Sequence, residues 1–301
     1  MLVKCNICPR GCLVDRSTSS GFCGAPEKIA VSRISLHQWE EPPISGERGS
    51  GTIFFSGCNL RCVFCQNKVI SSQKGAFENA KIISAEELAR SMLDLAALGA
   101  HNINLVTPTH YASAVKKALE IAKKELTIPV VYNSSGYESV ETLRSLSGLI
   151  DVYLPDLKYF SSELSSRYSA APDYFEVASS ALVEMHRQVG AARLERGLMT
   201  GGVIVRHLVL PSCRHDSIKI LEALAQLLPV ADVKLSLMRQ YTPDFVDGEK
   251  FPELARRLTS FEYESVAKRA SELGFDGYVQ SAESATSKYT PSFNCPEAFF
   301  V

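Results

Sequence analysis

Three cysteines in the segment Gly57–Asn67 have the spacing of a metal-binding loop. Cys58, Cys62 and Cys65 form a C-x3-C-x2-C pattern directly after an apolar stretch that is expected to be a strand. Thiolates this close along one loop can converge on a single inorganic centre. On a 4Fe–4S cluster, three thiolates leave one iron without a protein ligand, and that open position can hold a substrate or a cofactor. A zinc knuckle that borrows a distant fourth ligand is the alternative interpretation.

A second group of cysteines lies near the N-terminus. Cys5, Cys8, Cys12 and Cys23 follow the pattern C-x2-C-x3-C-x10-C, and the intervening glycines and proline favour tight turns. Four thiols are the number that a closed site needs, either a structural zinc or an auxiliary iron–sulfur centre. The spacing does not decide between zinc and iron–sulfur, and four free or redox-active thiols are the alternative.

The cysteine count and the charge limit the classes of protein. Seven of the nine cysteines lie within the first 65 residues, and Cys213 and Cys295 are expected to be inert. Lys and Arg number 32 and Asp and Glu 33, so the positive charge that drives nucleic-acid binding is absent. No apolar run has the roughly 20 residues of a membrane helix, and the N-terminus lacks the apolar region of a signal peptide. We therefore expect a cytoplasmic protein with no nucleic-acid and no membrane partner.

The cysteine loop belongs to a chain that alternates strand and helix patterns. Short apolar stretches predict strands at residues 52–55, 103–106, 129–132, 149–154, 203–210 and 233–238. Amphipathic stretches between them predict helices, one of which begins with the capping box Ser84–Glu87. Alternation with short connections requires parallel strands and crossover helices. The expected fold is α/β, a partial (β/α)6 barrel of the TIM type, and Tyr278-Val279 is a candidate for one further strand.

The change of pattern along the chain suggests three regions. Residues 1–45 lack a clear period and are expected to form a small metal-binding segment, which has too little core to fold alone. Residues 46–245 are expected to form the barrel, and residues 246–301 a helical extension that packs on it. Glu40 and Glu41 precede the barrel and are expected to pack against its mouth.

The segment from Cys58 to Asn67 resembles the cluster-binding loop of the radical S-adenosylmethionine (radical SAM) superfamily. This resemblance implies a partial barrel, a 4Fe–4S cluster and S-adenosylmethionine bound to the open iron. It also implies reductive cleavage of S-adenosylmethionine to a 5′-deoxyadenosyl radical that abstracts a substrate hydrogen. Phe64 stands where the family has an aromatic residue that packs on the adenine, and Asn67 is a further cofactor-binding residue of the same motif.

A closer resemblance is to the branch of glycyl-radical-enzyme activases that is like the pyruvate formate-lyase activating enzyme and has an N-terminal cysteine segment. It is carried by the motifs Cys62–Asn67, Asp156-Leu157-Lys158 after the fourth strand and Arg206–Pro211 on the fifth. The resemblance implies that Lys158 and His207 face the methionine carboxylate or the substrate backbone and that Asp156 helps to hold a monovalent cation. It further implies a glycyl radical enzyme as the partner and a flavodoxin- or ferredoxin-type electron donor.

Two positions depart from the activase pattern. The run Val106–His110 lacks the Gly pair and the carboxylate that bind the methionine amino group in activases, so Thr107 and backbone carbonyls near Pro108 are expected to replace them. After the third strand, Asn133 stands where activases have an aspartate, and its amide oxygen can ligate a cation without supplying charge. Asn133 and its neighbour Ser134 complete the expected cofactor-binding residues.

Ordinary structural roles compete with these assignments. Asp156 and Lys158 can form a surface ion pair, His207 can be a core histidine, and His110 is expected to be a solvated loop histidine. Two other functions also stay open. One is a radical SAM enzyme that acts on a small molecule or another peptide, and the other is a non-catalytic zinc or iron–sulfur scaffold protein.

Overall fold

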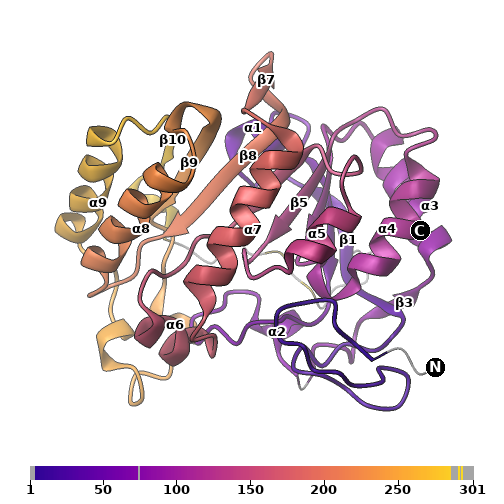
Figure 1. Ribbon diagram of the computed structural model, residues 1–301, viewed down its shortest axis with the longest axis horizontal. Helices are drawn as coiled ribbons and strands as arrows, with labels where there is room; N and C mark the ends of the chain where they lie inside the picture. Colours follow the sequence, from indigo (N-terminus) through magenta and orange to yellow (C-terminus); the bar gives the residue numbers. More distant parts are fainter. Residues whose placement is uncertain (1–3, 74, 286–290, 292, 294–301) are drawn as a thin grey trace.

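The structure, a computed structural model, describes residues 4–73, 75–285, 291 and 293. Its centre is a curved sheet flanked by helices (Figure 1). In spatial order the strands are β10 (Gly277–Val279), β9 (Val233–Met238), β8 (Leu198–Leu208), β6 (Val152–Pro155), β5 (Val130–Ser134), β4 (Ile103–Val106), β2 (Ser50–Phe55), β1 (Ile29–His37) and β3 (Lys81–Ile83), with β7 (Arg193–Glu195) paired to β8. Within the described residues this order is an open path, so the sheet forms a partial barrel.

Seven strands, β2, β4, β5, β6, β8, β9 and β10, run parallel to one another along the sheet, whereas β1, β3 and β7 pair antiparallel. Six of them, β2, β4, β5, β6, β8 and β9, overlap the apolar stretches that predicted strands, and β10 confirms the candidate at Tyr278-Val279. The predicted α/β partial barrel is therefore confirmed. Because all these strands point the same way, their carboxyl ends meet at one edge, where barrel enzymes build their sites.

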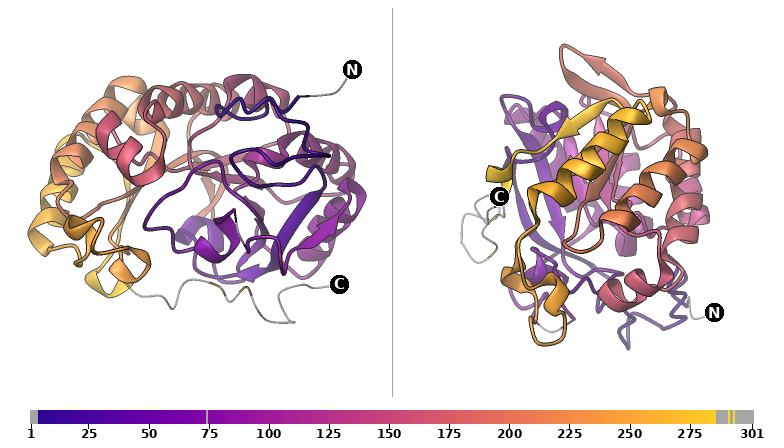
Figure 2. Two further views of the ribbon diagram at one scale, coloured as in Figure 1. Left: turned by 90° about the horizontal axis from the view of Figure 1, so that it is seen from below. Right: turned by 90° about the vertical axis from the view of Figure 1, so that its left-hand side faces the viewer.

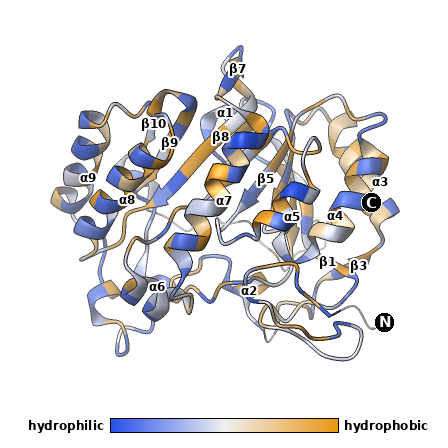
Figure 3. Cartoon of the chain, viewed as in Figure 1, coloured by the Kyte–Doolittle hydropathy of each residue, from blue (hydrophilic) through white to orange (hydrophobic). Residues whose placement is uncertain are grey.

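Helices cover the outer face of the sheet, as Figures 1 and 2 show. The helices of the described residues are α1 (Pro42–Ser45), α2 (Lys68–Ser71), α3 (Ala85–Ala97), α4 (Ala112–Ala122), α5 (Val140–Ser145), α6 (Ser162–Ser169), α7 (Tyr174–Val189), α8 (Arg214–Leu227) and α9 (Ser260–Glu272). The short helices α1 and α2 lie instead at the amino and the carboxyl end of the barrel. The capping box that predicted α3 is present, since Ser84 and Glu87 each accept from the other's backbone N–H. In Figure 3 the strands are largely hydrophobic and the helices carry hydrophilic residues on their outward sides, as a core between sheet and helices requires.

Three strands were missed by the sequence pattern. In β1 a bulge between Val31 and Arg33 breaks the alternation that marks a strand, and β3 and β7 have only three residues each. Strand β1 pairs antiparallel with β2, so residues Ile29–His37 of the segment 1–45, in which no strand was predicted, are part of the sheet. The proposed boundaries near residues 45 and 245 stay predictions.

The two ends of the barrel are covered differently. At the amino end, Asn102 donates to the carbonyl of Ile44 in α1 at 2.7 Å, which holds α1 beneath the strands. At the carboxyl end, the segment from Lys4 to Lys28, indigo in Figure 1, lies against the loops that follow β2, β4 and β5. Of the helices in the described residues, none is long and apolar enough to cross a membrane.

Candidate active site

The cysteine loop leaves β2 through a position that only glycine can occupy. Gly57 has φ of +91°, and a Cβ there would lie 2.9 Å from the carbonyl oxygen of Cys23. The backbone of the N-terminal segment therefore packs directly on the start of the loop. The Gly57 N–H donates to the carbonyl of Ile70 at 2.7 Å, which holds the other end of the loop close to the first.

The three thiols of this loop line one cavity at the carboxyl ends of the strands. The N–H of Leu60 donates to Cys58 Sγ at 3.4 Å, and the Ser169 hydroxyl donates to Cys62 Sγ at 3.0 Å. Cys65 Sγ lies 3.3 Å from the hydroxyl of Ser71. Hydrogen bonds of this kind stabilise sulfur in its anionic, metal-binding form.

The surroundings of Cys58 and Cys62 raise the pKa values of both thiols. Burial raises the pKa of Cys58, and the nearby Cys62 and Cys65 raise it further. Burial also raises the pKa of Cys62, against the lowering effect of the Lys158 ammonium. A bound metal centre would lower these pKa values, since metal binding removes the thiol protons.

The donor set fits a cluster rather than a closed single-ion site. Three sulfurs from one loop, none in a disulfide, face an open cavity. Across the described residues, no three His, Cys, Asp or Glu side chains are arranged to hold a metal ion as they stand. Cys58, Cys62 and Cys65 would be the ligands that hold a 4Fe–4S cluster.

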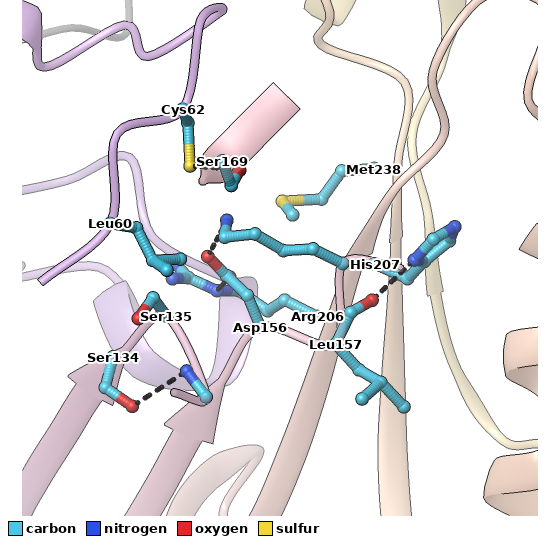
Figure 4. A network of polar contacts seen from close by, with 12 residues as sticks. Leu60, Cys62, Ser134, Ser135, Asp156, Leu157, Ser169, Arg206, His207 and Met238 are labelled. Atoms are coloured by element: carbon cyan, nitrogen blue, oxygen red, sulfur yellow. Dashed lines mark hydrogen bonds and ion pairs between the residues drawn. The ribbon is translucent and has the colours of Figure 1, made fainter. Parts of the chain in front are cut away.

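An ionic network lies across the cavity from the cysteine loop (Figure 4). Lys158 Nζ lies 2.5 Å from Asp156 Oδ2, and Arg206 Nε lies 2.9 Å from Asp156 Oδ1. Burial alone would raise the pKa of Asp156, but the charges of Arg206 and Lys158 outweigh it and hold that pKa below its ordinary value. Burial alone would lower the pKa of Lys158, but Asp156 and Cys62 outweigh it and raise that pKa. Asp156 and Lys158 are thus ionised and oriented, with the ammonium on the side of the cysteine loop.

Comparison with known proteins agrees with this geometry. The sequence profile of the radical SAM superfamily matches residues 52–202, which include the cysteine loop and the strands β2, β4, β5 and β6. The chain belongs to the radical SAM superfamily. It is also 32% identical over 284 residues to the uncharacterized protein MJ0674 of Methanocaldococcus jannaschii, a match that covers 91% of this chain and 76% of that protein.

A solved structure shows the same fold. The chain superimposes on SuiB of Streptococcus suis with a TM-score of 0.50 and 13% sequence identity, over 74% of this chain. The match spans 47% of SuiB, about half of its length. At this identity the similarity supports the fold of the radical SAM chain and nothing about its substrate.

The positions expected to hold S-adenosylmethionine line the cavity of this radical SAM chain. Phe64 is buried there and packs edge-to-face on Tyr241, with ring centroids 6.2 Å apart. Asn67 lies at the N-terminal boundary of α2, on the same wall. Thr107 has φ of +58°, a strained conformation for a β-branched residue, and its N–H donates to the carbonyl of Asn133 at 2.8 Å. The structure therefore brings these side chains together, and their roles stay predictions.

Asn133 and Ser134 also line the cavity, but a guanidinium occupies the place expected for a monovalent cation. Arg206 donates to Asn133 Oδ1 at 2.6 Å and pairs with Asp156, the two oxygens predicted as cation ligands. The arginine already supplies positive charge at this position, so the structure gives the predicted cation no support. Ser134 Oγ accepts from the N–H of Gly136 at 3.2 Å, which shapes the turn after β5.

His207 is not part of the cavity. Its neighbours Arg206 and Leu208 line the cavity, so strand alternation turns His207 to the other side of β8, and Figure 4 shows its ring pointing away from Asp156 and Cys62. Its Nδ1 bonds to the carbonyl of Leu157 at 2.7 Å, and burial lowers its pKa to about 4. A neutral histidine in this position holds β8 against the segment Asp156–Lys158. The prediction that His207 faces the methionine carboxylate or the substrate backbone is therefore not borne out.

Two acidic residues lie deeper in the barrel than the sequence indicated. Glu40 accepts from Asn104 at 3.0 Å and lies 3.5 Å from Arg206, and Glu41 lies 4.0 Å from Arg206. The sequence placed them at the mouth because they precede the first predicted strand. Arg206 could have been found as their partner from the alternation of β8, which turns Arg206 and Leu208 to one face.

The N-terminal cysteines gather in a compact ribbon. Cys5 N–H donates to Val14 O at 2.8 Å, and the N–H of Phe22 donates to Cys12 Sγ at 3.3 Å. Burial raises the pKa of Cys8 to about 12, and the nearby Cys23 and Cys12 add to the effect. The four thiols thus lie close enough to influence one another, although the metal assigned to them stays a prediction.

Proposed function

We propose that this radical SAM enzyme is a glycyl-radical-enzyme activase. The observation that supports the proposal is the single cavity lined by the cysteine loop on one side and the Asp156–Lys158 pair on the other. When bound, a reduced 4Fe–4S cluster supplies the electron that cleaves S-adenosylmethionine into methionine and a 5′-deoxyadenosyl radical. The protein's own contribution is to position the reactants and to exclude water.

The side chains of the cavity have complementary tasks in this proposal. Lys158, held by Asp156 and facing Cys62, supplies the positive charge that a methionine carboxylate needs. The backbone carbonyls next to Thr107 accept from the methionine ammonium, and Phe64 packs on the adenine. Burial of this wall keeps water from the reacting carbon.

The proposed reaction, cleavage of S-adenosylmethionine followed by hydrogen abstraction, consumes one electron. An external flavodoxin- or ferredoxin-type protein supplies that electron, and the carbon–sulfur bond of S-adenosylmethionine breaks. One hydrogen atom then moves from a glycine Cα of the partner to the 5′ carbon, which leaves 5′-deoxyadenosine and a glycyl radical. Lys158 keeps its proton throughout.

We further propose that Cys5, Cys8, Cys12 and Cys23 bind a second metal centre, zinc or iron–sulfur. The support is their proximity in a ribbon whose Gly11, at φ of +49°, donates to the carbonyl of Cys8 at 3.1 Å. Such a centre would fix a segment that otherwise has little core of its own.

A second candidate substrate is a small molecule or another peptide. It is favoured by the second cavity beside the first, described below, and by the missing carboxylate in Val106–His110. The scaffold alternative is disfavoured because the chain belongs to an enzyme superfamily.

The activase proposal is tested with the anaerobically reconstituted enzyme, S-adenosylmethionine and a candidate glycyl radical enzyme. Electron paramagnetic resonance should show a glycyl doublet, and the Lys158→Met variant should reduce its yield by at least about tenfold. Glu195→Gln, an exposed residue of β7, is the control. Cleavage of S-adenosylmethionine without a doublet in any partner tried would support the small-molecule or peptide alternative instead.

A further inference from the structure

A second cavity opens beside the cysteine cavity, between the connection that precedes α1 and the strands β9 and β10. The two cavities share the lining residues Trp39, Glu40, Arg206, Met238 and Gln240. A ligand in the second cavity therefore reaches the space in front of the cysteine loop. The second cavity contains none of the predicted S-adenosylmethionine contacts.

The walls of the second cavity hold more acidic than basic side chains. Glu40 and Glu41 both line it, and the cation that faces them is Arg206. The guanidinium makes its shorter contact, 2.9 Å, with Asp156, and lies 3.5 Å from Glu40 and 4.0 Å from Glu41. Lys158 is held by Asp156 on the side of the cysteine loop and does not line this cavity.

Glu41 is the carboxylate that is least satisfied. The residue is 8% exposed, and among the described residues its Oε2 has no hydrogen-bond partner. Burial raises the pKa of Glu41, and the charge of Arg206 and a hydrogen bond with Ser236 only partly oppose this. Buried carboxylates are normally paired or hydrogen-bonded, so an oxygen without a donor indicates that a group is missing from its surroundings.

From these contacts we propose that the second cavity binds a cationic group of the substrate, an ammonium or a guanidinium, against Glu41 and Glu40. The proposal rests on the proposed function, since it places the rest of that substrate in front of the cysteine loop. Met238 lines both cavities and offers an apolar surface for an alkyl stem between the cation and the reacting carbon. The nearby side-chain amides of Gln240 and Gln280 are hydrogen-bonded to each other, since Gln280 Nε2 donates to Gln240 Oε1 at 3.1 Å. The carboxylates are therefore the acceptors left for a cation.

Binding is tested on the reconstituted full-length enzyme with S-adenosylmethionine present, by calorimetry and by the emission of Trp39. Trp39 is the single tryptophan of the chain and lines both cavities, so with S-adenosylmethionine already bound a further change in its emission reports binding of the added probe. The probes are the butylguanidinium ion and butylurea, which has the same shape without the charge. We expect butylguanidinium to bind at least about tenfold more tightly than butylurea, since a charged hydrogen bond replaces a neutral one.

Two variants locate the site. Glu41→Gln keeps the shape of the side chain and should weaken butylguanidinium by at least about tenfold, and Glu40→Gln serves where Glu41→Gln fails to fold. Glu47→Gln, an exposed glutamate after α1, should leave the affinity unchanged. Equal affinity for the two probes, unaltered affinity in both cavity variants, or displacement of butylguanidinium by S-adenosylmethionine would overturn the proposal.

A further comparison identifies the source of the cation. A hexapeptide with a central arginine should bind more tightly than butylguanidinium if the substrate is a polypeptide, and no more tightly if it is a small molecule. Its analogue with citrulline in place of arginine should bind more weakly than the arginine peptide in either case, because citrulline carries no charge. These measurements do not need turnover. An enzyme that forms 5′-deoxyadenosine but does not bind the cation contradicts this inference alone, and one that binds it without cleaving S-adenosylmethionine contradicts the proposed function alone.

Discussion

The two groups of cysteines differ in what surrounds them more than in their spacing. The loop with Cys58, Cys62 and Cys65 faces an open cavity whose far wall is the ionic network of Asp156, Lys158 and Arg206. The N-terminal ribbon is instead closed by its own backbone hydrogen bonds and packed on the barrel. Three thiols in front of charged side chains suit a centre that exchanges a ligand, whereas four thiols within a ribbon suit a centre that only holds the chain together.

Removing a thiol from the open loop should have the largest effect. In Cys58→Ala the formation of 5′-deoxyadenosine should fall at least about 1,000-fold, because residues that act as one unit fail together when one is lost. Chromatography of the nucleoside products measures it. The matched control is Cys213→Ala, a buried cysteine outside the cavity, which should keep the activity. Retention of more than a tenth of the activity in Cys58→Ala would show that the loop is not the cluster site.

The ionic network around Arg206 should contribute more to the free energy of unfolding than a surface ion pair does. Arg206→Met leaves Asp156, Glu40 and Glu41 without their shared cation, so the free energy of unfolding should fall by about 3–5 kcal/mol. Denaturant titration measures it. Arg269→Met breaks a surface pair with Glu222 and should leave the free energy of unfolding nearly unchanged, because water screens an exposed pair. Equal losses in the two variants would mean that Arg206 does not organise the cavity.

His110 lies between the two regions and should make stability depend on pH. It is buried, not solvated as the sequence suggested, and its Nε2 lies 2.7 Å from the carbonyl oxygen of Ser56 in a hydrogen bond. Arg16 donates to the backbone carbonyl of His110. Burial lowers the pKa of His110 to about 4, against about 6.5 in the unfolded chain, so the unfolded state binds more protons and stability is lost as pH falls from about 6.5 toward 4.

Comparison of the wild type with His110→Gln tests this. Between pH 7 and pH 5 the wild type should lose about 2 kcal/mol more of its unfolding free energy than the variant. Urea titrations at the two pH values measure the difference. An identical pH dependence in both proteins would show that His110 is protonated in the folded state as readily as in the unfolded one.

The contact that joins the N-terminal ribbon to the open loop should have the smallest effect. Arg10 donates to the carbonyls of Asn59 and Ala170 and stacks on Phe22, with 3.8 Å between the guanidinium carbon and the ring centroid. Arg10→Met should increase hydrogen exchange across the ribbon by about tenfold, the equivalent of about 1.4 kcal/mol, and leave β5 unchanged. Lys117→Met, on the exposed side of α4, is the control, and similar exchange in both variants would contradict the role of Arg10.

The sequence predicted the barrel and the cysteine loop because both depend on local patterns. Apolar runs define β2, β4, β5, β6, β8 and β9, and the spacing of Cys58, Cys62 and Cys65 lies within one loop. What it missed depends on contacts between distant segments. The pairing of Arg206 with Glu40 joins residues 166 positions apart, and His207 was assigned to the cavity because its motif, rather than the alternation of β8, was followed. Strand β1 was missed because its bulge hides its period.

The central claim is that the open loop carries the chemistry and the ribbon does not, and it is tested by one set of reconstituted proteins. Iron, sulfide and 5′-deoxyadenosine are counted after anaerobic reconstitution of the wild type, Cys58→Ala and Cys5→Ala. We expect nucleoside formation by the wild type, none by Cys58→Ala, and a measurable fraction by Cys5→Ala. Complete loss in both variants with the fold intact, or a wild type that holds its full cluster and forms no 5′-deoxyadenosine, would contradict it.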